Sequence, residues 1–240
     1  MLEELRAELV RCAKEAEAQG LCRHRSGNFS ARDPATGLIC MTPSGVDRRT
    51  MCAEDIVVMT PAAEVVEARE GLKPTSEALM HLAAYEERAD IRAVAHTHSP
   101  FALVFAVLGR PIPPVVLEAA HLHTADGVVP VAPFAPQGTK ALADSVRGPL
   151  RTGDALLLGQ HGALAVGATP DEALLRAAYL EEIAEVYYRT LLLTNGAEPP
   201  RLSPEALTLR YPRLRTANES TAPDTVNENR HCRNDKERFG

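Results

Sequence analysis

The apolar positions of the chain follow two periods, and the change from one to the other separates predicted helices from predicted strands. Leu2, Leu5, Leu9 and Cys12 recur at helical spacing, and Gly20 is suited to end that helix, which we predict over 2–19. Further helices are predicted over 77–87, 101–108, 139–146 and 169–193. Short apolar runs predict strands over 38–41, 56–59, 64–66, 92–98, 115–118 and 155–158.

The order of these elements indicates the fold class. Strands are joined by short turns early in the chain and by helices later, which is typical of one α/β domain whose central sheet is layered by helices. We expect this domain over 1–198 and a C-terminal extension over 199–215. Residues 216–240 are rich in Asn, Glu, Thr, Asp and Arg with almost no apolar spacing, so a disordered tail is expected there.

Composition and charge argue against a nucleic-acid-binding, a disulfide-linked and a membrane-spanning protein. The 240 residues are 45% hydrophobic, enough for a core, and the net charge of −6 argues against a nucleic-acid partner held by bulk electrostatics. Five cysteines, an odd number without C-x-x-C spacing, suggest reduced thiols in a cytoplasmic protein. The charged N-terminus does not resemble a signal peptide, and no apolar run approaches the roughly 20 residues of a membrane span.

The strand over 92–98 ends in His96-Thr97-His98. Side chains at i and i+2 of a strand point to the same face, so His96 and His98 are expected side by side. Two imidazoles placed in this way form half of a divalent metal site. The alternative is a pair of ordinary, partly buried histidines, and the motif alone does not exclude it.

Two further segments favour the metal interpretation. Glu77 opens a predicted helix after Pro74-Thr75-Ser76, and His161 follows the apolar run over 155–158. A third imidazole and one carboxylate would complete a set of three nitrogens and one oxygen, which suits zinc or a neighbouring divalent ion.

Three loops also carry groups that can hold an anion. One contains Gly27, Asn28 and Ser30, the second contains Ser44 and Gly45, and the third is Thr75-Ser76 at a helix start. Hydroxyl groups beside flexible glycine and the N-terminus of a helix both favour an anion such as phosphate. Each loop alone is weak evidence, and the first by itself favours a plain turn. Their joint occurrence before a metal-like cluster is more informative.

Six motifs in this order resemble the class II aldolase/adducin family, and within it the L-fuculose-1-phosphate aldolases and their bacterial relatives. They are Ser-Gly-Asn-Phe-Ser (26–30), Thr-Pro-Ser-Gly (42–45), Pro-Thr-Ser-Glu (74–77), His-Thr-His-Ser (96–99), Pro-Val-Ala-Pro-Phe (130–134) and Gln-His-Gly (160–162). The resemblance covers roughly residues 1–195 and implies an α/β/α fold with a central, largely antiparallel sheet.

The resemblance also implies an activity and a site. It implies a cytoplasmic homotetramer with one Zn²⁺ per subunit that cleaves a phosphorylated ketose, such as L-fuculose 1-phosphate, to dihydroxyacetone phosphate and a short aldehyde. The implied zinc ligands are His96, His98, His161 and Glu77, with Glu77 also acting as the acid/base. The implied phosphate-binding positions are Asn28, Ser44, Gly45, Thr75 and Ser76.

The chain departs from the family pattern at two places. The fuculose-phosphate aldolases carry a proton-donating tyrosine after the position of Pro114, whereas this chain continues Val-Val-Leu-Glu. Glu118, His121 or His123 could supply that proton, or they could be surface or interface residues. Arg25 stands where the family has a small hydroxyl residue, and it would add positive charge for a phosphate or a carboxylate.

The missing tyrosine leaves other reactions of the same scaffold open. These are sugar-phosphate epimerisation, dehydration and decarboxylation, and a phosphate-free reaction on a small hydroxy-keto acid. A non-catalytic, adducin-like interaction module is disfavoured because the metal set is complete in this chain.

Overall fold

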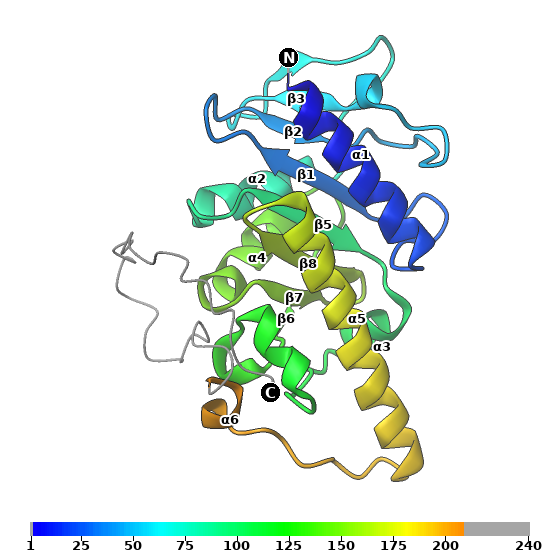
Figure 1. The fold of residues 1–240 in the computed structure, drawn as a ribbon, viewed down its shortest axis with the longest axis vertical. Helices are drawn as coiled ribbons and strands as arrows, with labels where there is room; N and C mark the ends of the chain where they lie inside the picture. The colour runs from blue at the N-terminus through cyan, green and yellow to red at the C-terminus, as the bar shows by residue number, and fades with distance from the viewer. Residues whose placement is uncertain (1, 209–240) are drawn as a thin grey trace, which may run out of the picture.

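An eight-stranded sheet runs through the centre of the molecule. In Figure 1 its strands are stacked from the top of the view to the bottom, with α1 and α5 in front of them. The computed structural model describes residues 2–208. The strand order is β4-β3-β2-β1-β5-β8-β7-β6, and every neighbouring pair is antiparallel except β6 and β7. The strands are β1 (Asn28–Arg32), β2 (Ile39–Met41), β3 (Val57–Met59), β4 (Val65–Glu67), β5 (Ala93–Thr97), β6 (Val131–Ala132), β7 (Ala155–Leu158) and β8 (Gly162–Gly167). The largely antiparallel sheet expected from the resemblance is confirmed.

Helices cover both faces of this sheet. Helices α1, α3 and α5 lie on one face, seen in front of the sheet in Figure 1, and α2 and α4 pack against each other on the other face. Their bounds are α1 (Glu3–Ala18), α2 (Ala78–Glu87), α3 (Pro100–Leu108), α4 (Lys140–Thr152), α5 (Pro170–Leu193) and the short α6 (Pro204–Thr208). Short 3₁₀ turns are η1 (Ala53–Asp55), η2 (Leu117–Leu122) and η3 (Ala125–Gly127).

Strand alternation divides the buried side chains between two cores. In β5, Ala93 and Ala95 face α1, α3 and α5, whereas Val94 belongs to the core beneath α2 and α4. Phe29 and Ala31 of β1 lie in the first core, so Asn28 and Ser30 must point to the second face. This register places polar side chains of β1 on the same face as His96 and directly under α2.

The prediction of a strand over 115–118 was wrong. Val115 and Val116 pack against the core without joining the sheet, and a 3₁₀ turn, η2, begins at Leu117. The preceding Pro113 and Pro114 have no backbone N–H for a strand ladder, so burial alone accounts for these apolar residues.

Two strands of the sheet centre were missed. The segment of β1 is predicted as an anion-binding loop because of Gly27, Asn28 and Ser30, and β8 consists mostly of glycine and alanine. Both lie next to β5 and are buried on both faces, where small or polar residues carry no clear alternation. The expectation for residues 216–240 lies outside the described residues.

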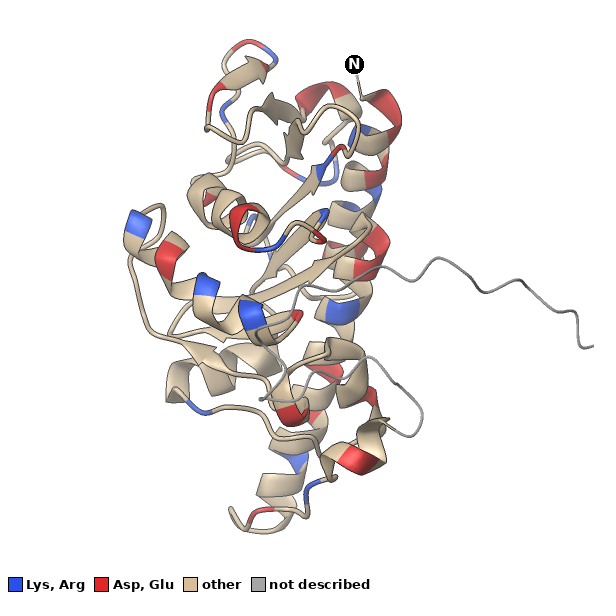
Figure 2. Ribbon diagram, turned by 90° about the vertical axis from the view of Figure 1, so that its left-hand side faces the viewer, with Lys and Arg blue, Asp and Glu red and all other residues tan. Residues whose placement is uncertain are grey.

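Three further observations belong to the described part of the chain. None of its helices combines the length and apolar character needed to cross a membrane. Its four cysteines, Cys12, Cys22, Cys40 and Cys52, are free thiols. Basic and acidic segments are mixed over the face drawn in Figure 2, and ion pairs such as Arg147–Glu86 join α4 to α2.

A buried charge cluster ties the sheet to the helices on both faces. Asp154, just before β7, contacts Arg88 at 2.5 Å, His123 at 2.8 Å and Arg176 at 3.2 Å. Burial alone would raise the pKa of Asp154, but the hydrogen bond from His123 and the charges of Arg88 and Arg176 lower it to about 2. The carboxylate therefore holds two buried guanidinium groups in place.

We expect Asp154→Ala to lower the free energy of unfolding by about 3 kcal/mol at pH 7, because Arg88 and Arg176 lose their buried carboxylate and keep only the more exposed Asp90 and Glu172. Because the pKa is depressed in the folded state, this stabilisation is present above pH 4 and is lost as the pH falls towards 2. Urea unfolding at pH 7 and pH 3 measures both effects. The exposed Asp144→Ala is the control, and an equal loss in the two variants would contradict the prediction.

Candidate metal and substrate site

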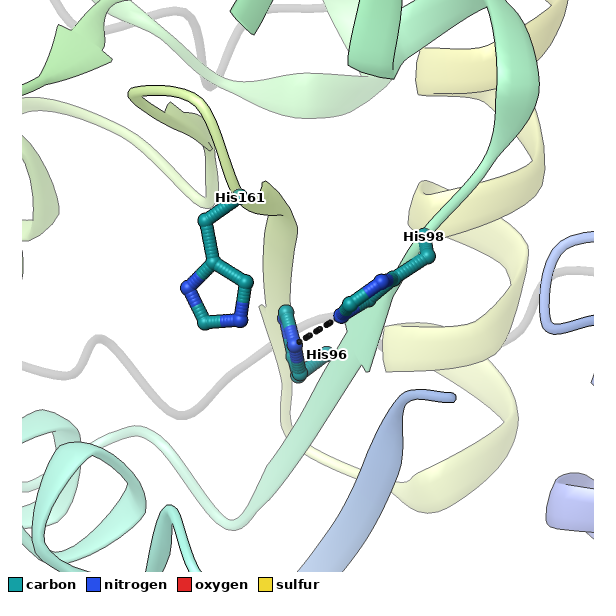
Figure 3. Close-up of side chains that lie close together, drawn as sticks. All are labelled: His96, His98 and His161. Carbon is teal, nitrogen blue, oxygen red and sulfur yellow. Dashed lines mark hydrogen bonds between the residues drawn. The ribbon is translucent and has the colours of Figure 1, made fainter. Parts of the chain in front are cut away.

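Three histidines converge where β5 ends and where β7 turns into β8. His96 lies in β5, His98 follows that strand, and His161 lies in the turn before β8, as Figure 3 shows. The ring centroids are 4.8 to 5.2 Å apart, and one nitrogen from each ring lies within 4.8 Å of the others. Residues 65 positions apart in the sequence thus present their ring nitrogens to one point.

Glu77 closes this group from the opposite side. It immediately precedes α2, is 1% exposed, and places Oε2 3.1 Å from Nε2 of His96 and Oε1 2.9 Å from Nε2 of His161. Oε1 is buried yet accepts no hydrogen bond of good geometry within the described residues. The residue before α2 therefore places one buried carboxylate oxygen beside His161 without a hydrogen bond.

The donor set fits a divalent cation. Nδ1 of His96 lies 2.9 Å from the carbonyl oxygen of Ala163, which only accepts, so this nitrogen carries a proton. A neutral His96 then directs the lone pair of Nε2 at the Glu77 carboxylate, and two acceptors repel unless a positive charge lies between them. Three imidazole nitrogens and one carboxylate oxygen are ligands that zinc takes, and the backbone carbonyl orients the His96 ring for this role.

The electrostatics of the group favour the protonation states that bind a cation. Burial alone would raise the pKa of Glu77, but the neighbouring imidazoles of His96 and His161 and the hydrogen bond from Asn28 lower it. Burial, together with the neighbouring His96 and His161, lowers the pKa of His98 to about 4. At neutral pH, Glu77 is therefore ionised and His98 is neutral.

Two glycines allow the close packing of this site. A Cβ at Gly162 would lie 2.5 Å from the carbonyl oxygen of Thr97 and 3.1 Å from the ring of His96. Gly27 has φ +75°, and a Cβ there would lie 2.6 Å from the backbone oxygen of His96. A larger residue at either position would push the histidine strand out of place.

The three loops predicted to hold an anion lie next to each other beside Glu77. The N–H of Thr75 donates to the carbonyl of Thr42 at 3.1 Å, and that of Ser44 donates to Lys73 at 2.9 Å, which joins the second loop to the third. Ser44, Gly45 and Ser76 are exposed, whereas Thr75 is buried and its hydroxyl accepts from the N–H of Glu77. The exposed hydroxyls of Ser44 and Ser76 therefore belong to two joined loops, one of which leads directly into Glu77.

Asn28 has a different environment from the one its motif suggested. Its side-chain N–H donates to Oε2 of Glu77 at 2.7 Å, and its side-chain oxygen lies 2.5 Å from Nε2 of His81. One N–H of the amide is left for a substrate, so a role in phosphate binding is compatible with this arrangement.

Two residues near the site escaped the sequence interpretation. His81 is completely buried, and burial lowers its pKa to about 3. Its spacing of four from Glu77 was the available signal. Arg48 is also buried and donates to the carbonyl oxygens of Ser26 and Gly27, and nothing in the sequence marked it.

The candidate proton donors lie elsewhere in the chain. His123 contacts Asp154 before the start of β7, whereas His161 follows the end of that strand. His121 stacks on Tyr179 with ring centroids 4.3 Å apart, and Glu118 lies with it in η2. A four-residue strand separates this group from the candidate metal ligands by roughly 13 Å, so the described part of one chain does not bring them together.

Comparison with known proteins places this geometry in a family. Residues 7–188 match the model of the class II aldolase and adducin N-terminal domain. The chain is 35% identical over 205 residues to a 5-deoxy-D-ribulose 1-phosphate aldolase of Bacillus thuringiensis serovar kurstaki, covering 85% of this chain and 92% of that protein. It is 30% identical to an L-ribulose-5-phosphate 4-epimerase of Salmonella paratyphi A, covering 82% and 90%.

A solved structure gives the same result. That of an L-fuculose 1-phosphate aldolase superimposes with a TM-score of 0.80 at 33% identity, covering 88% of this chain and 95% of the other. The match to the family model, over 7–188, spans the sheet, the helices on both faces and the segments that carry the three histidines and Glu77. The chain therefore belongs to the class II aldolase and adducin family and is an enzyme of the class II aldolase type.

Proposed function

We propose that this enzyme is a zinc-dependent aldolase that cleaves a ketose 1-phosphate, of the L-fuculose 1-phosphate or 5-deoxyribulose 1-phosphate kind, to dihydroxyacetone phosphate and a short aldehyde. The observation that carries the proposal is the convergence of His96, His98 and His161 with the buried carboxylate of Glu77 beside three hydroxyl-bearing loops. A cation held by these residues would supply a Lewis acid for the carbonyl group of the substrate.

Glu77 has the properties of the acid/base for this cleavage. Its ionised carboxylate takes the proton of the hydroxyl at carbon 4, and the bond between carbons 3 and 4 breaks with its electron pair left on carbon 3. The same carboxyl group then returns the proton to carbon 3, which completes dihydroxyacetone phosphate, and carbon 4 leaves as an aldehyde. Oε1, the oxygen without a hydrogen-bond partner, is the atom available for both transfers.

The neighbouring loops supply a site for the phosphate. The hydroxyls of Ser44 and Ser76 and the backbone N–H of Gly45 belong to exposed residues of these loops, and Asn28 has one N–H left. Fixing the phosphate there would hold the reacting carbons against the carboxylate, which is the main contribution a binding loop makes to such a reaction.

Among the described residues, none of the three candidates for a second acid/base group lies beside Glu77. Glu118, His121 and His123 are distant from Glu77, so any of them would act only across a boundary between subunits of an oligomer, which we expect to be a homotetramer. The absence of a tyrosine after Pro114 and the epimerase among the relatives make sugar-phosphate epimerisation the second candidate function.

A substrate panel separates these functions. We expect cleavage of one or more ketose 1-phosphates, followed as dihydroxyacetone phosphate formation in a coupled assay, to fall below a tenth after chelation and to return with Zn²⁺. Epimerisation of ketose 5-phosphates, followed by chromatography, is the competing outcome. Cleavage that persists unchanged in fully metal-free protein would overturn the proposed role of the metal.

A further inference from the structure

A continuous series of buried hydrogen bonds leads from Tyr85 on α2, through side chains of β1 and α2, to Glu77. Hydrogen-bonded neighbours are Tyr85 OH and Ser30 Oγ at 2.7 Å, Ser30 Oγ and His81 Nδ1 at 2.7 Å, and His81 Nε2 and Asn28 Oδ1 at 2.5 Å. Asn28 then donates to Glu77 Oε2 at 2.7 Å. Ser30 and His81 are completely buried, and Tyr85 is 4% exposed.

The direction of every hydrogen bond in this series follows from its last member. An ionised carboxylate only accepts, so Asn28 must turn its amide N–H to Glu77 and its oxygen to His81. An amide oxygen also only accepts, so Nε2 of His81 carries the proton. A neutral His81 then has its lone pair on Nδ1, Ser30 must donate to it, and Tyr85 must donate to Ser30.

All these hydrogen bonds therefore run the same way, from Tyr85 towards Oε2 of Glu77. Hydrogen bonds in such a series polarise one another, which strengthens the last of them. The two oxygens of Glu77 become unequal: Oε2 is held by Asn28, whereas Oε1 accepts no hydrogen bond. Reversing the series would require Asn28 to flip and His81 to change tautomer together.

We propose that His81, as its Nε2–H tautomer and through Asn28, is a positioning residue that fixes Oε2 of Glu77 and reserves Oε1 for the substrate proton. This proposal rests on the aldolase function proposed above, and it adds a role for a residue that touches neither metal nor substrate. His81 can do this because it lies one helical turn after Glu77 on α2 and faces the polar side chains of β1.

The test compares His81→Phe with His81→Gln in the zinc-loaded enzyme. Phenylalanine fills the space but neither donates nor accepts, and we expect kcat to fall about 30-fold, as for other groups that orient an active-site residue, with KM within about threefold. Glutamine can donate to Asn28 and accept from Ser30, so we expect it to restore kcat to within about fivefold of the wild type. Leu82→Ala, a buried neighbour on α2, is the control for loss of packing, and its kcat should stay near that of the wild type.

A second measurement does not depend on turnover. In ¹⁵N-histidine-labelled, metal-free protein, His81 should show a protonated Nε2 and an unprotonated Nδ1 at neutral pH. An Nδ1–H tautomer, or an unchanged kcat in His81→Phe, would overturn the proposal. A loss of kcat in His81→Phe that glutamine does not restore would show that the histidine only supports packing.

The experiment also covers a variant that does not fold and a wild type that has no aldolase activity. If His81→Phe does not fold, Ser30→Ala takes its place, and a kcat equal to that of the wild type would overturn the proposal. If the wild type cleaves no ketose phosphate, the proposed function fails, and the tautomer of His81 still decides whether the hydrogen-bond series exists.

Discussion

Replacing His96 by alanine is expected to abolish metal binding while leaving the protein folded. Its ring is the centre of the cluster, with Nε2 3.0 Å from that of His98 and 3.1 Å from the carboxylate of Glu77. Loss of an outer partner of a ligand costs about 10- to 100-fold in metal affinity, so loss of the ligand itself should cost at least about 100-fold. Bound Zn²⁺, measured by elemental analysis after gel filtration, should fall from one per chain to below a tenth.

His121→Ala is the matched control for metal content. His121 stacks on Tyr179 at the other end of β7, so its removal should leave one Zn²⁺ per chain. Circular dichroism of both variants checks that the fold persists. Equal metal content in His96→Ala and the wild type would refute the ligand assignment, and the activity of His121→Ala tests in addition whether this histidine takes part in proton transfer.

Glu77→Gln is expected to lower kcat for ketose-phosphate cleavage about 1,000-fold. General acid/base catalysis contributes about 10²- to 10⁴-fold, and an amide of the same shape can neither take nor return the proton. Asn28 and the histidines would still hold the side chain, because glutamine keeps one oxygen for them. Steady-state kinetics with the best substrate of the panel measures the effect.

The control for this variant is Glu86→Gln on the same helix. Glu86 is exposed and pairs with Arg147, and a surface ion pair of this kind contributes at most about 1 kcal/mol to stability. Its kcat should therefore equal that of the wild type. A Glu77→Gln enzyme that retains a tenth or more of the wild-type kcat would show that another group moves the proton.

The outer parts of the fold could be predicted from local pattern, whereas the middle of the sheet could not. Helices such as α5 carry their own signals, since Thr169 accepts from the N–H of Glu172 as its capping motif predicts. Strands β1 and β8 carry none, because a strand buried on both faces next to β5 shows no alternation. The strand predicted over 115–118 failed for the related reason that burial alone does not make a strand.

The sequence by itself determined which groups the site contains. His96 and His98 share a strand face because of their spacing of two, and Glu77 begins a helix because of the residues around it. Only the tertiary structure decided what surrounds them, because a side chain's partners across a sheet depend on strand register. The pairing of Asn28 with His96 on neighbouring strands brings the amide under Glu77 and joins it to His81. His121 and His123 lie at the far end of β7.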